Sequence, residues 1–276
     1  MILGIDIGTT TTKAVSVENG KLVKKIKTRA ADAVTSATGA FGKLVLENGI
    51  RMSDIEGIII TGAGSSKLGK EIFGIPARRV DEITAIGIGG MFLSGKDHII
   101  IANVGTGTAI IEAEEGSIVH LGGSGVGGGT VQGLAKKLLP VSDFSGIMAL
   151  AAGGNLKQVD LLLEDIMDTR LSFLDGETTA SNFGKMLDSA APGDIARGLL
   201  NMAYQVIGML SVFAAKSKNL DRVIVTGRGS NNPIGKQVLS VITGMYGVEF
   251  EYPPDAEYTT AAGAGLSVKA GSSFAS

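Results

Sequence analysis

The sequence predicts an α/β protein of two lobes that repeat one pattern of strands and helices. The chain has 276 residues, more than one small core normally needs, so two structural units are expected. Residues 1–93 suggest three strands joined by turns, then a helix, a strand and further helices, and a similar order restarts at residue 99. Internal duplication of this kind is a stronger indication of fold than a single motif. We place the boundary near residues 94–97, giving lobes 1–96 and 97–276.

The first lobe is expected to open with three antiparallel strands. Residues 1–7 are apolar around one acid, residues 14–17 resume a strand, and Asn19-Gly20 is a strong hairpin signal before residues 21–27. A helix with apolar residues at helical spacing is expected at residues 33–48, where Gly49 closes it. The remaining elements expected in this lobe are a buried strand at 55–61, a short helix at 66–73 and a helix at 83–93.

The second lobe is expected to begin with three more strands joined by turns, at residues 99–104, 109–113 and 117–121. Helices should follow at residues 130–139, 145–152, 156–165 and 195–216, of which the last is long and apolar on one face. The chain should then form a buried strand at 222–226, a helix at 234–244, a strand at 248–252 and a final small-residue helix at 258–270.

Composition excludes several classes of function. A formal net charge of −2 gives no electrostatic case for binding nucleic acid or an anionic membrane. The chain has no cysteine, which excludes disulfides and an iron–sulfur cluster held by its own thiolates. No apolar run approaches the ~20 residues of a membrane span, and a chain that starts directly with a strand predicts no signal peptide. We therefore expect a soluble cytoplasmic protein.

Two glycine-rich turns in the second lobe are the main functional signal. The strand at residues 99–104 runs into Gly105-Thr106-Gly107-Thr108, and six glycines lie between Gly122 and Gly129, just before a helix. Glycine permits close backbone approach, and a helix start offers free N–H groups and a favourable dipole to an anion. The two turns therefore suggest a polyphosphate held from two sides. The alternative is a pair of glycine-rich hairpins that bind no ligand.

An earlier turn, at residues 8–13, is associated with two charged residues, Asp6 just before it and Lys13 at its end. Asp6 lies in an apolar strand, and a buried carboxylate is costly unless it is paired or near a cation. At a phosphate turn that cation would be Mg²⁺, bound through water because Mg²⁺ loses water reluctantly. Lys13 could contact a terminal phosphate as a point charge. The alternatives are a hydrogen-bonded structural aspartate and a solvated hairpin lysine.

Asp81-Glu82 precedes the predicted helix at residues 83–93. A carboxylate there, close to a nucleotide, could accept the proton of a substrate hydroxyl, a step that typically contributes roughly 10²–10⁴-fold in rate. Acids are also common at helix starts for purely electrostatic reasons. The residues alone leave these two explanations evenly balanced.

These features resemble the superfamily of acetate and sugar kinases, Hsp70 and actin. The resemblance implies a two-lobed, duplicated ribonuclease H-like fold, with a mixed five-stranded sheet in each lobe and the nucleotide in the cleft. It makes residues 6–13 the first phosphate turn, residues 103–108 the second phosphate turn and residues 227–232 the adenosine segment. Nucleotide contacts are thereby implied for Asp6, Gly8, Thr9, Thr10, Thr11, Lys13, Gly105, Thr106, Gly107 and Gly227, with Mg²⁺ at Asp6.

Three segments, at residues 102–108, 122–134 and 179–184, narrow the resemblance to type II pantothenate kinases. Those enzymes transfer the γ-phosphate of ATP to the primary hydroxyl of pantothenate, the first step towards coenzyme A. The resemblance implies that Glu82 is the catalytic carboxylate and that the helix at residues 195–216 is a candidate element of a homodimer interface. Further nucleotide-contacting positions that it implies are Gly128, Gly129, Thr130, Val131, Gln132, Phe144 and Ser230.

The sequence departs from that family at the position that holds the substrate. His120 stands where the family has an arginine, two residues before the glycine cluster. A histidine cannot make the bidentate carboxylate contact of an arginine. A kinase of a related metabolite is therefore an alternative, and a strand residue without a role is another explanation of His120.

Besides a pantothenate kinase and a kinase of a related metabolite, a third possible function is a nucleotide-driven switch or activator. Residues 4–13 and 80–85 also resemble ATPase activators of acyl-CoA dehydratases. Those activators hold an iron–sulfur cluster through cysteines, which this chain lacks.

Overall fold

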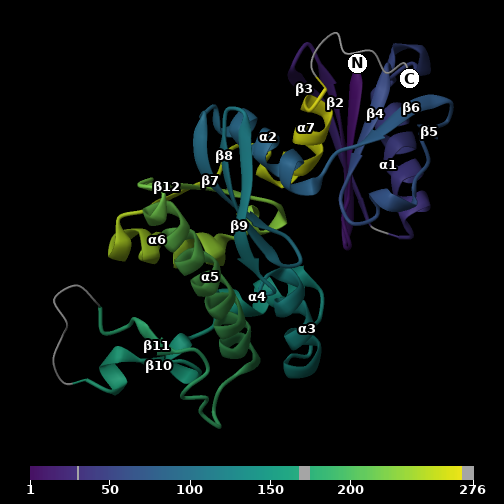
Figure 1. Ribbon diagram of the computed structural model, residues 1–276. Coiled ribbons are helices and arrows are strands. Elements are labelled where there is room, and N and C mark those ends of the chain that lie inside the picture. Colours follow the sequence, from purple (N-terminus) through teal and green to yellow (C-terminus); the bar gives the residue numbers. More distant parts are fainter. Residues whose placement is uncertain (30, 168–174, 269–276) are drawn as a thin grey trace.

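The computed structural model describes residues 1–29, 31–167 and 175–268, which form two large β-sheets with helices packed against them and a small two-stranded sheet (Figure 1). The first sheet has the strand order β3-β2-β1-β4-β6-β5, and the second has the order β13-β12-β7-β8-β9. Read from the other edge, the second order is β9-β8-β7-β12-β13, which matches the first five strands of the first sheet in position and direction. The predicted two-lobed α/β fold with a repeated five-stranded sheet is confirmed.

The first sheet is built around β1 (Ile2–Ile7), which pairs antiparallel with β2 (Thr11–Glu18) and parallel with β4 (Gly57–Thr61). Strand β3 (Lys21–Arg29) adds to β2, and β6 (Ile75–Arg79) adds to β4. Helix α1 (Ala33–Asn48) covers one face of this sheet, between the Asp32 side-chain cap and Gly49 in the left-handed conformation. Its boundaries agree with the sequence because both end signals are local.

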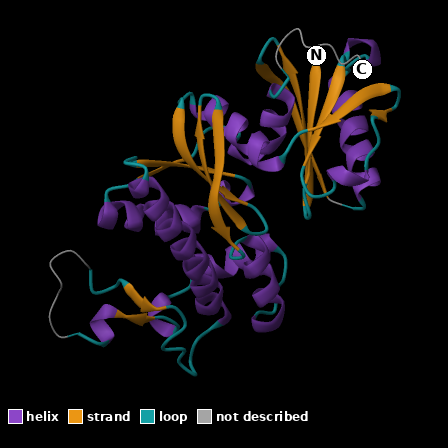
Figure 2. Cartoon of the chain, in the orientation of Figure 1, coloured by secondary structure: helices purple, strands orange, loops and turns teal. Residues whose placement is uncertain are grey.

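The second sheet combines β7 (His98–Val104), β8 (Thr108–Glu114), β9 (Ser117–Ser124), β12 (Arg222–Thr226) and β13 (Glu249–Glu251). It packs on helices α3 (Gly128–Leu138), α4 (Phe144–Ala152), α5 (Pro192–Ser217) and α6 (Pro233–Tyr246). By length and composition α5 could cross a membrane, but 61% of its most apolar stretch is buried inside the protein, as in a core helix. Figure 2 shows α5 running along the second lobe.

Two helices lie between the sheets, α2 (Glu82–Ser94) and α7 (Thr259–Leu266) (Figure 1). They cross closely through glycines, since a Cβ on Gly263 would lie only 1.8 Å from the carbonyl oxygen of Ala85. Helix α7 packs on β1, β2 and β4, whereas α2 packs on β7, β8 and β9 as well as on α7. A boundary between residues 96 and 97 leaves the strands of the first sheet before it and those of the second sheet after it. Helix α7 also lies after this boundary in the sequence, but it packs on the first sheet.

Two predicted helices are wrong. Residues 66–73 form a short 3₁₀ turn (Ser65–Lys67) and strand β5 (Glu71–Ile72), which extends the first sheet to six strands by pairing with β6. Residues 156–165 form two 3₁₀ turns (Leu156–Gln158 and Leu163–Asp165) around strand β10 (Leu161–Leu162), which pairs with β11 (Thr179–Ser181). The final helix ends at Leu266, and the expected end at residue 270 lies outside the described residues.

A buried carboxylate explains the second error. Asp160 is completely buried and accepts hydrogen bonds from Phe183 N at 2.9 Å, Asn201 Nδ2 at 2.8 Å and Thr179 Oγ1 at 3.1 Å. These bonds fix the chain around residue 160 against β11 and α5, in place of the helix that local spacing suggests. A buried carboxylate needs such partners, and all of them lie far away in the sequence.

Candidate active site

A cavity of about 740 Å³ lies where the two lobes meet, and residues of both lobes line it. It brings together most of the site residues expected from the sequence, although these come from positions more than 200 residues apart. The predicted residues that line it are Asp6, Gly8, Thr9, Thr10, Thr11, Lys13, Glu82, Gly105, Thr106, Gly107, His120, Gly128, Gly129, Val131, Gln132, Phe144 and Gly227.

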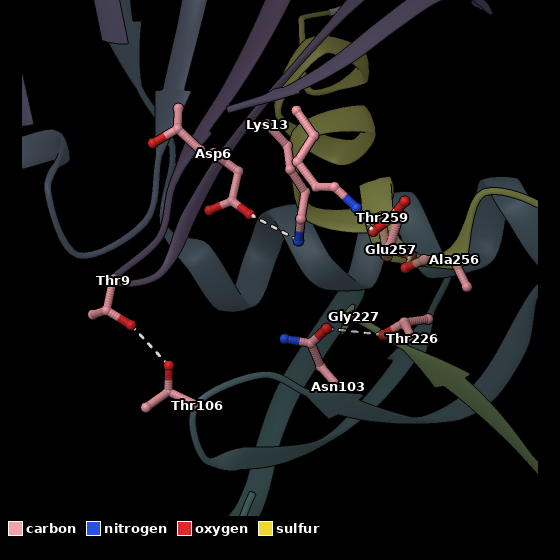
Figure 3. Close-up of polar contacts among 12 residues, drawn as sticks. Asp6, Thr9, Lys13, Asn103, Thr106, Thr226, Gly227, Ala256, Glu257 and Thr259 are labelled. Atoms are coloured by element: carbon pink, nitrogen blue, oxygen red, sulfur yellow. Dashed lines mark hydrogen bonds and ion pairs between the residues drawn. The ribbon is translucent and has the colours of Figure 1, made fainter. Parts of the chain in front are cut away.

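The two turns predicted to bind phosphate face each other across this cavity. Thr9 Oγ1 lies 2.7 Å from Thr106 Oγ1, so a single hydroxyl–hydroxyl hydrogen bond joins the turns of the two lobes (Figure 3). Both hydroxyls are on exposed residues and can exchange this bond for one to a ligand. The geometry therefore fits an anionic group that is bound by residues of both lobes.

The start of α3 packs directly on the second phosphate turn. Gly128 N donates to Gly105 O and Gly129 N donates to Thr106 O, each at 2.9 Å. These two N–H groups are therefore occupied by the turn in this structure. Their role is to fix the shape of the turn, while the α3 dipole still points its positive end at the cavity.

Two predicted residues lie outside the cavity lining. The Thr130 hydroxyl accepts from Gly127 N at 3.3 Å and donates to Gly125 O at 2.8 Å, which makes it part of the α3 cap. The Ser230 hydroxyl is buried and donates to Gly227 O at 2.8 Å. Both side chains shape glycine loops that themselves line the cavity.

Asp6 and Lys13 form a buried, solvent-poor pair at the end of the first sheet. Lys13 Nζ lies 3.9 Å from Asp6 Oδ2, and the two residues are direct neighbours on β1 and β2 (Figure 3). Burial raises the pKa of the Asp6 carboxyl to about 6, with the Lys13 charge opposing the rise and the Glu82 charge adding to it. A carboxylate destabilised in this way is poised to gain from a nearby cation.

The two acids before α2 have clearly different environments. The Asp81 carboxylate caps the helix by accepting from Thr84 N at 3.1 Å, so its role is structural. Glu82 lines the cavity, and burial together with the Asp81 charge raises the pKa of its carboxyl above the usual range. A carboxyl with a raised pKa is a better proton acceptor, as general-base catalysis requires.

His120 lies on β9 opposite Ile111 of β8, and its exposed side chain is at the edge of the cavity. Any contact that it makes with a ligand would therefore be at the open side of the site, where water competes for the same partner.

Several cavity residues were not identified from the sequence. Arg228 was part of the adenosine segment without a role of its own, and its guanidinium lies 5.5 Å from the centre of the Phe144 ring, a cation–π distance. Tyr204 donates its hydroxyl to Gly229 O at 2.7 Å, and burial raises the pKa of that hydroxyl. The apolar floor combines Val131, which was expected from the sequence, with the α5 residues Leu200, Ala203, Tyr204 and Ile207, which were not. Their helical spacing was indistinguishable from that of ordinary core residues.

Comparison with known proteins identifies relatives over most of the chain. Residues 97–248, more than half of the chain, match the Fumble family. A type II pantothenate kinase of Bacillus anthracis is 33% identical over 193 residues, which cover 66% of this chain and 70% of that protein. A type II pantothenate kinase of Staphylococcus haemolyticus is 27% identical over 225 residues, covering 78% of this chain and 84% of the relative.

Solved structures share the fold at low sequence identity. An activator of the 2-hydroxyisocaproyl-CoA dehydratase from Clostridium difficile, with bound ADPNP, superposes with a TM-score of 0.68 at 18% identity, covering 96% of this chain and 93% of that chain. A ROK hexokinase from Thermus thermophilus gives a TM-score of 0.57 at 16% identity, with 96% and 97% covered. At these identities the likeness establishes the architecture and nothing about the reaction.

Proposed function

The chain belongs to the Fumble family, and its curated bacterial relatives are type II pantothenate kinases; on this premise we propose that it phosphorylates pantothenate with ATP. The γ-phosphoryl group of ATP would pass to the primary hydroxyl of the acceptor. The observation that carries the proposal is the pair of predicted phosphate turns joined by Thr9 and Thr106, with the carboxyl of Glu82 in the same cavity.

Each part of the site has a role in this reaction. Phosphoryl transfer depends mainly on positioning and charge neutralisation, which the two turns and Lys13 would provide. Glu82 would orient the acceptor hydroxyl and take its proton at a carboxyl oxygen. The apolar floor and the Arg228–Phe144 pair form a surface suited to a flat nucleobase.

The donor set fits a magnesium ion that is bound mainly through water. The described residues contain no group of three or more acidic or histidine side chains that could enclose a metal. A single buried carboxylate, Asp6, is what Mg²⁺ requires when phosphates and waters supply the other ligands. When bound, the ion would neutralise phosphate charge during transfer.

We further propose that the protein is a cytoplasmic homodimer whose substrate is a small molecule, with neither nucleic acid nor membrane as a partner. Helix α5 is the candidate interface element. It exposes Phe213 (63%), and α6, which packs against α5, exposes Val241 (60%), so both helices offer a large apolar side chain to a partner.

Magnesium–ATP should bind and raise the melting temperature, because a ligand that binds only the folded state stabilises it. Gly105→Val should abolish most of this shift. A Cβ at residue 105 would meet only Gly107 O, at 3.8 Å, so the added bulk faces the ligand rather than the protein. Gly39→Val, on the open face of α1, is the matched control and should keep the full shift. A wild-type protein whose melting ignores millimolar Mg-ATP would rule out the proposed activity.

His120→Arg tests which acceptor the enzyme uses. His120 is the observation that favours the second candidate, a kinase of a metabolite related to pantothenate. If pantothenate is the present acceptor, the added arginine should change kcat/KM less than about threefold, since the residue is exposed. If a related metabolite is the acceptor, activity towards pantothenate should rise by about tenfold, the scale of a bidentate carboxylate contact. An ADP-release assay with pantothenate, related amides and sugars distinguishes these results. Hydrolysis that no acceptor accelerates would instead indicate a nucleotide-driven switch.

A further inference from the structure

The duplicated sheets place Asn103 at the position that Asp6 has in the first lobe. Asp6 is the parallel neighbour of Thr61, and Asn103 is the parallel neighbour of Thr226. A glycine with positive φ follows each threonine, Gly62 at +88° and Gly227 at +77°. A Cβ on either glycine would lie 2.8 Å from the side-chain oxygen of its partner, Asp6 Oδ1 or Asn103 Oδ1. We call Asp6 with Thr61 and Gly62 the first corner, and Asn103 with Thr226 and Gly227 the second corner. The two corners are equivalent in backbone and in side-chain direction.

The charges of the two corners differ. The antiparallel neighbour of Asp6 is Lys13, whereas the antiparallel neighbour of Asn103 is Ala109. The first lobe thus has a carboxylate with a cation beside it, and the second has an amide beside a methyl group. A buried carboxylate needs a cation nearby, whereas a buried amide does not. The second corner therefore has an uncharged side chain and no cation beside it on β8.

The two threonines differ in the same way. The Thr61 hydroxyl is buried and has no hydrogen-bond partner, whereas the equally buried Thr226 hydroxyl donates to Asn103 Oδ1 at 3.0 Å. This bond fixes which side of the amide is the acceptor. Figure 3 shows the Asn103 amide nitrogen directed away from Thr226. Because Asn103 lines the cavity and Thr226 lies behind it, the N–H donors of the amide face the cavity.

We propose that Asn103 binds a phosphate oxygen of the nucleotide through Nδ2, and that Thr226 is a positioning residue that holds the amide in this orientation. The inference rests on the proposed function, because its ligand is the nucleotide in the same cavity. An aspartate at residue 103 would only accept hydrogen bonds and would direct a second negative charge at the triphosphate. The second lobe therefore supplies a neutral donor where the first supplies an acid for a cation.

Substitutions at the two equivalent corners test this proposal. Asn103→Asp should weaken Mg-ATP binding by about tenfold or more, and Asn103→Ala by about tenfold, the scale of a hydrogen bond to a charged group. Thr226→Val should weaken binding by roughly threefold because the amide becomes free to rotate, and Thr226→Ser should restore it. Thr61→Val, the same change at the corner without a hydrogen bond, should leave binding unchanged.

Calorimetric titration of each folded variant with Mg-ATP gives the dissociation constants, and steady-state kinetics should show KM for ATP changing more than kcat. Melting temperatures identify any variant that has merely lost stability. Wild-type affinity in both Asn103 variants would overturn the phosphate contact. Equal losses in Thr226→Val and Thr61→Val, or no recovery in Thr226→Ser, would overturn the positioning role. A wild-type protein that does not bind Mg-ATP would overturn the proposed function together with this inference. A wild type that binds Mg-ATP, with both Asn103 variants binding it equally well, would overturn this inference alone.

Discussion

Replacing Glu82 with glutamine should lower the rate of phosphoryl transfer by about 10²-fold or more, while the affinity for Mg-ATP changes little. Glutamine keeps the shape of the side chain but cannot accept the proton of the acceptor hydroxyl, and a general base contributes roughly 10²–10⁴-fold. Burial and the Asp81 charge raise the pKa of the Glu82 carboxyl, which strengthens it as a base. In the proposed site the phosphates are held by other residues, so nucleotide binding should be retained. Steady-state kcat with pantothenate and calorimetric binding of Mg-ATP measure the two quantities.

Asp81→Asn is the matched control, because it makes the same chemical change at the adjacent residue. Asparagine caps a helix about as well as aspartate, so the bond to Thr84 N and the stability of α2 should persist. Its kcat should stay within a few-fold of the wild-type value. The acidic limb of its pH–rate profile should move to lower pH, since the Asp81 charge that raises the pKa of Glu82 is gone. Equal losses of rate in both variants would leave the base unassigned, and an unchanged rate in Glu82→Gln would end its catalytic role.

Local sequence signals were sufficient for the parts of the fold whose cause is local. Helix α1 was predicted at its observed bounds from helical spacing and Gly49, and the structure adds the Asp32 cap as a second local end signal. Strands such as β4 and β7 are buried on both faces and read as continuous apolar runs. The segment around Asp160 was predicted as a helix because its partners on β11 and α5 are distant in sequence. Short strands such as β5 exist only through tertiary pairing.

The candidate site divides in the same way. The phosphate turns are contiguous glycine and threonine segments, so their residues could be named from the sequence. The bond between Thr9 and Thr106 joins the lobes and has no local signal. Asp81 and Glu82 could not be told apart as sequence neighbours, because they differ in tertiary structure: Asp81 accepts a hydrogen bond from Thr84 N, whereas Glu82 lines the cavity. Arg228 and Tyr204 acquire their significance only from Phe144 and Gly229, which other elements provide.

The titration of Asp6 should move in opposite directions in two single variants. Burial raises the pKa of this carboxyl to about 6, the Lys13 charge lowers it and the Glu82 charge raises it. Lys13→Met removes the lowering influence, so the pKa should rise above 6. Glu82→Gln removes a raising influence, so the pKa should fall. Carbon-13 NMR of the Asp6 carboxyl in the ligand-free protein measures both shifts without involving any contact of Lys13 with phosphate.

The same shifts fix the sign of the pH dependence. The folded protein holds the Asp6 proton more tightly than the unfolded chain does, so this group favours folding at low pH, and the contribution is lost as the pH rises from about 4 through about 6. Binding of Mg-ATP should show the opposite trend and weaken as the pH falls through about 6, because the ionised carboxylate is the form that attracts a cation. In Lys13→Met this weakening should already begin at a higher pH than in the wild type, and raising the pH should recover part of the affinity. An Asp6 midpoint that stays in place in both variants would show that neither charge acts on this carboxyl. A midpoint that moves in the same direction in both would indicate a rearranged site, and the pairing of Asp6 with Lys13 would then not be the source of its charge state.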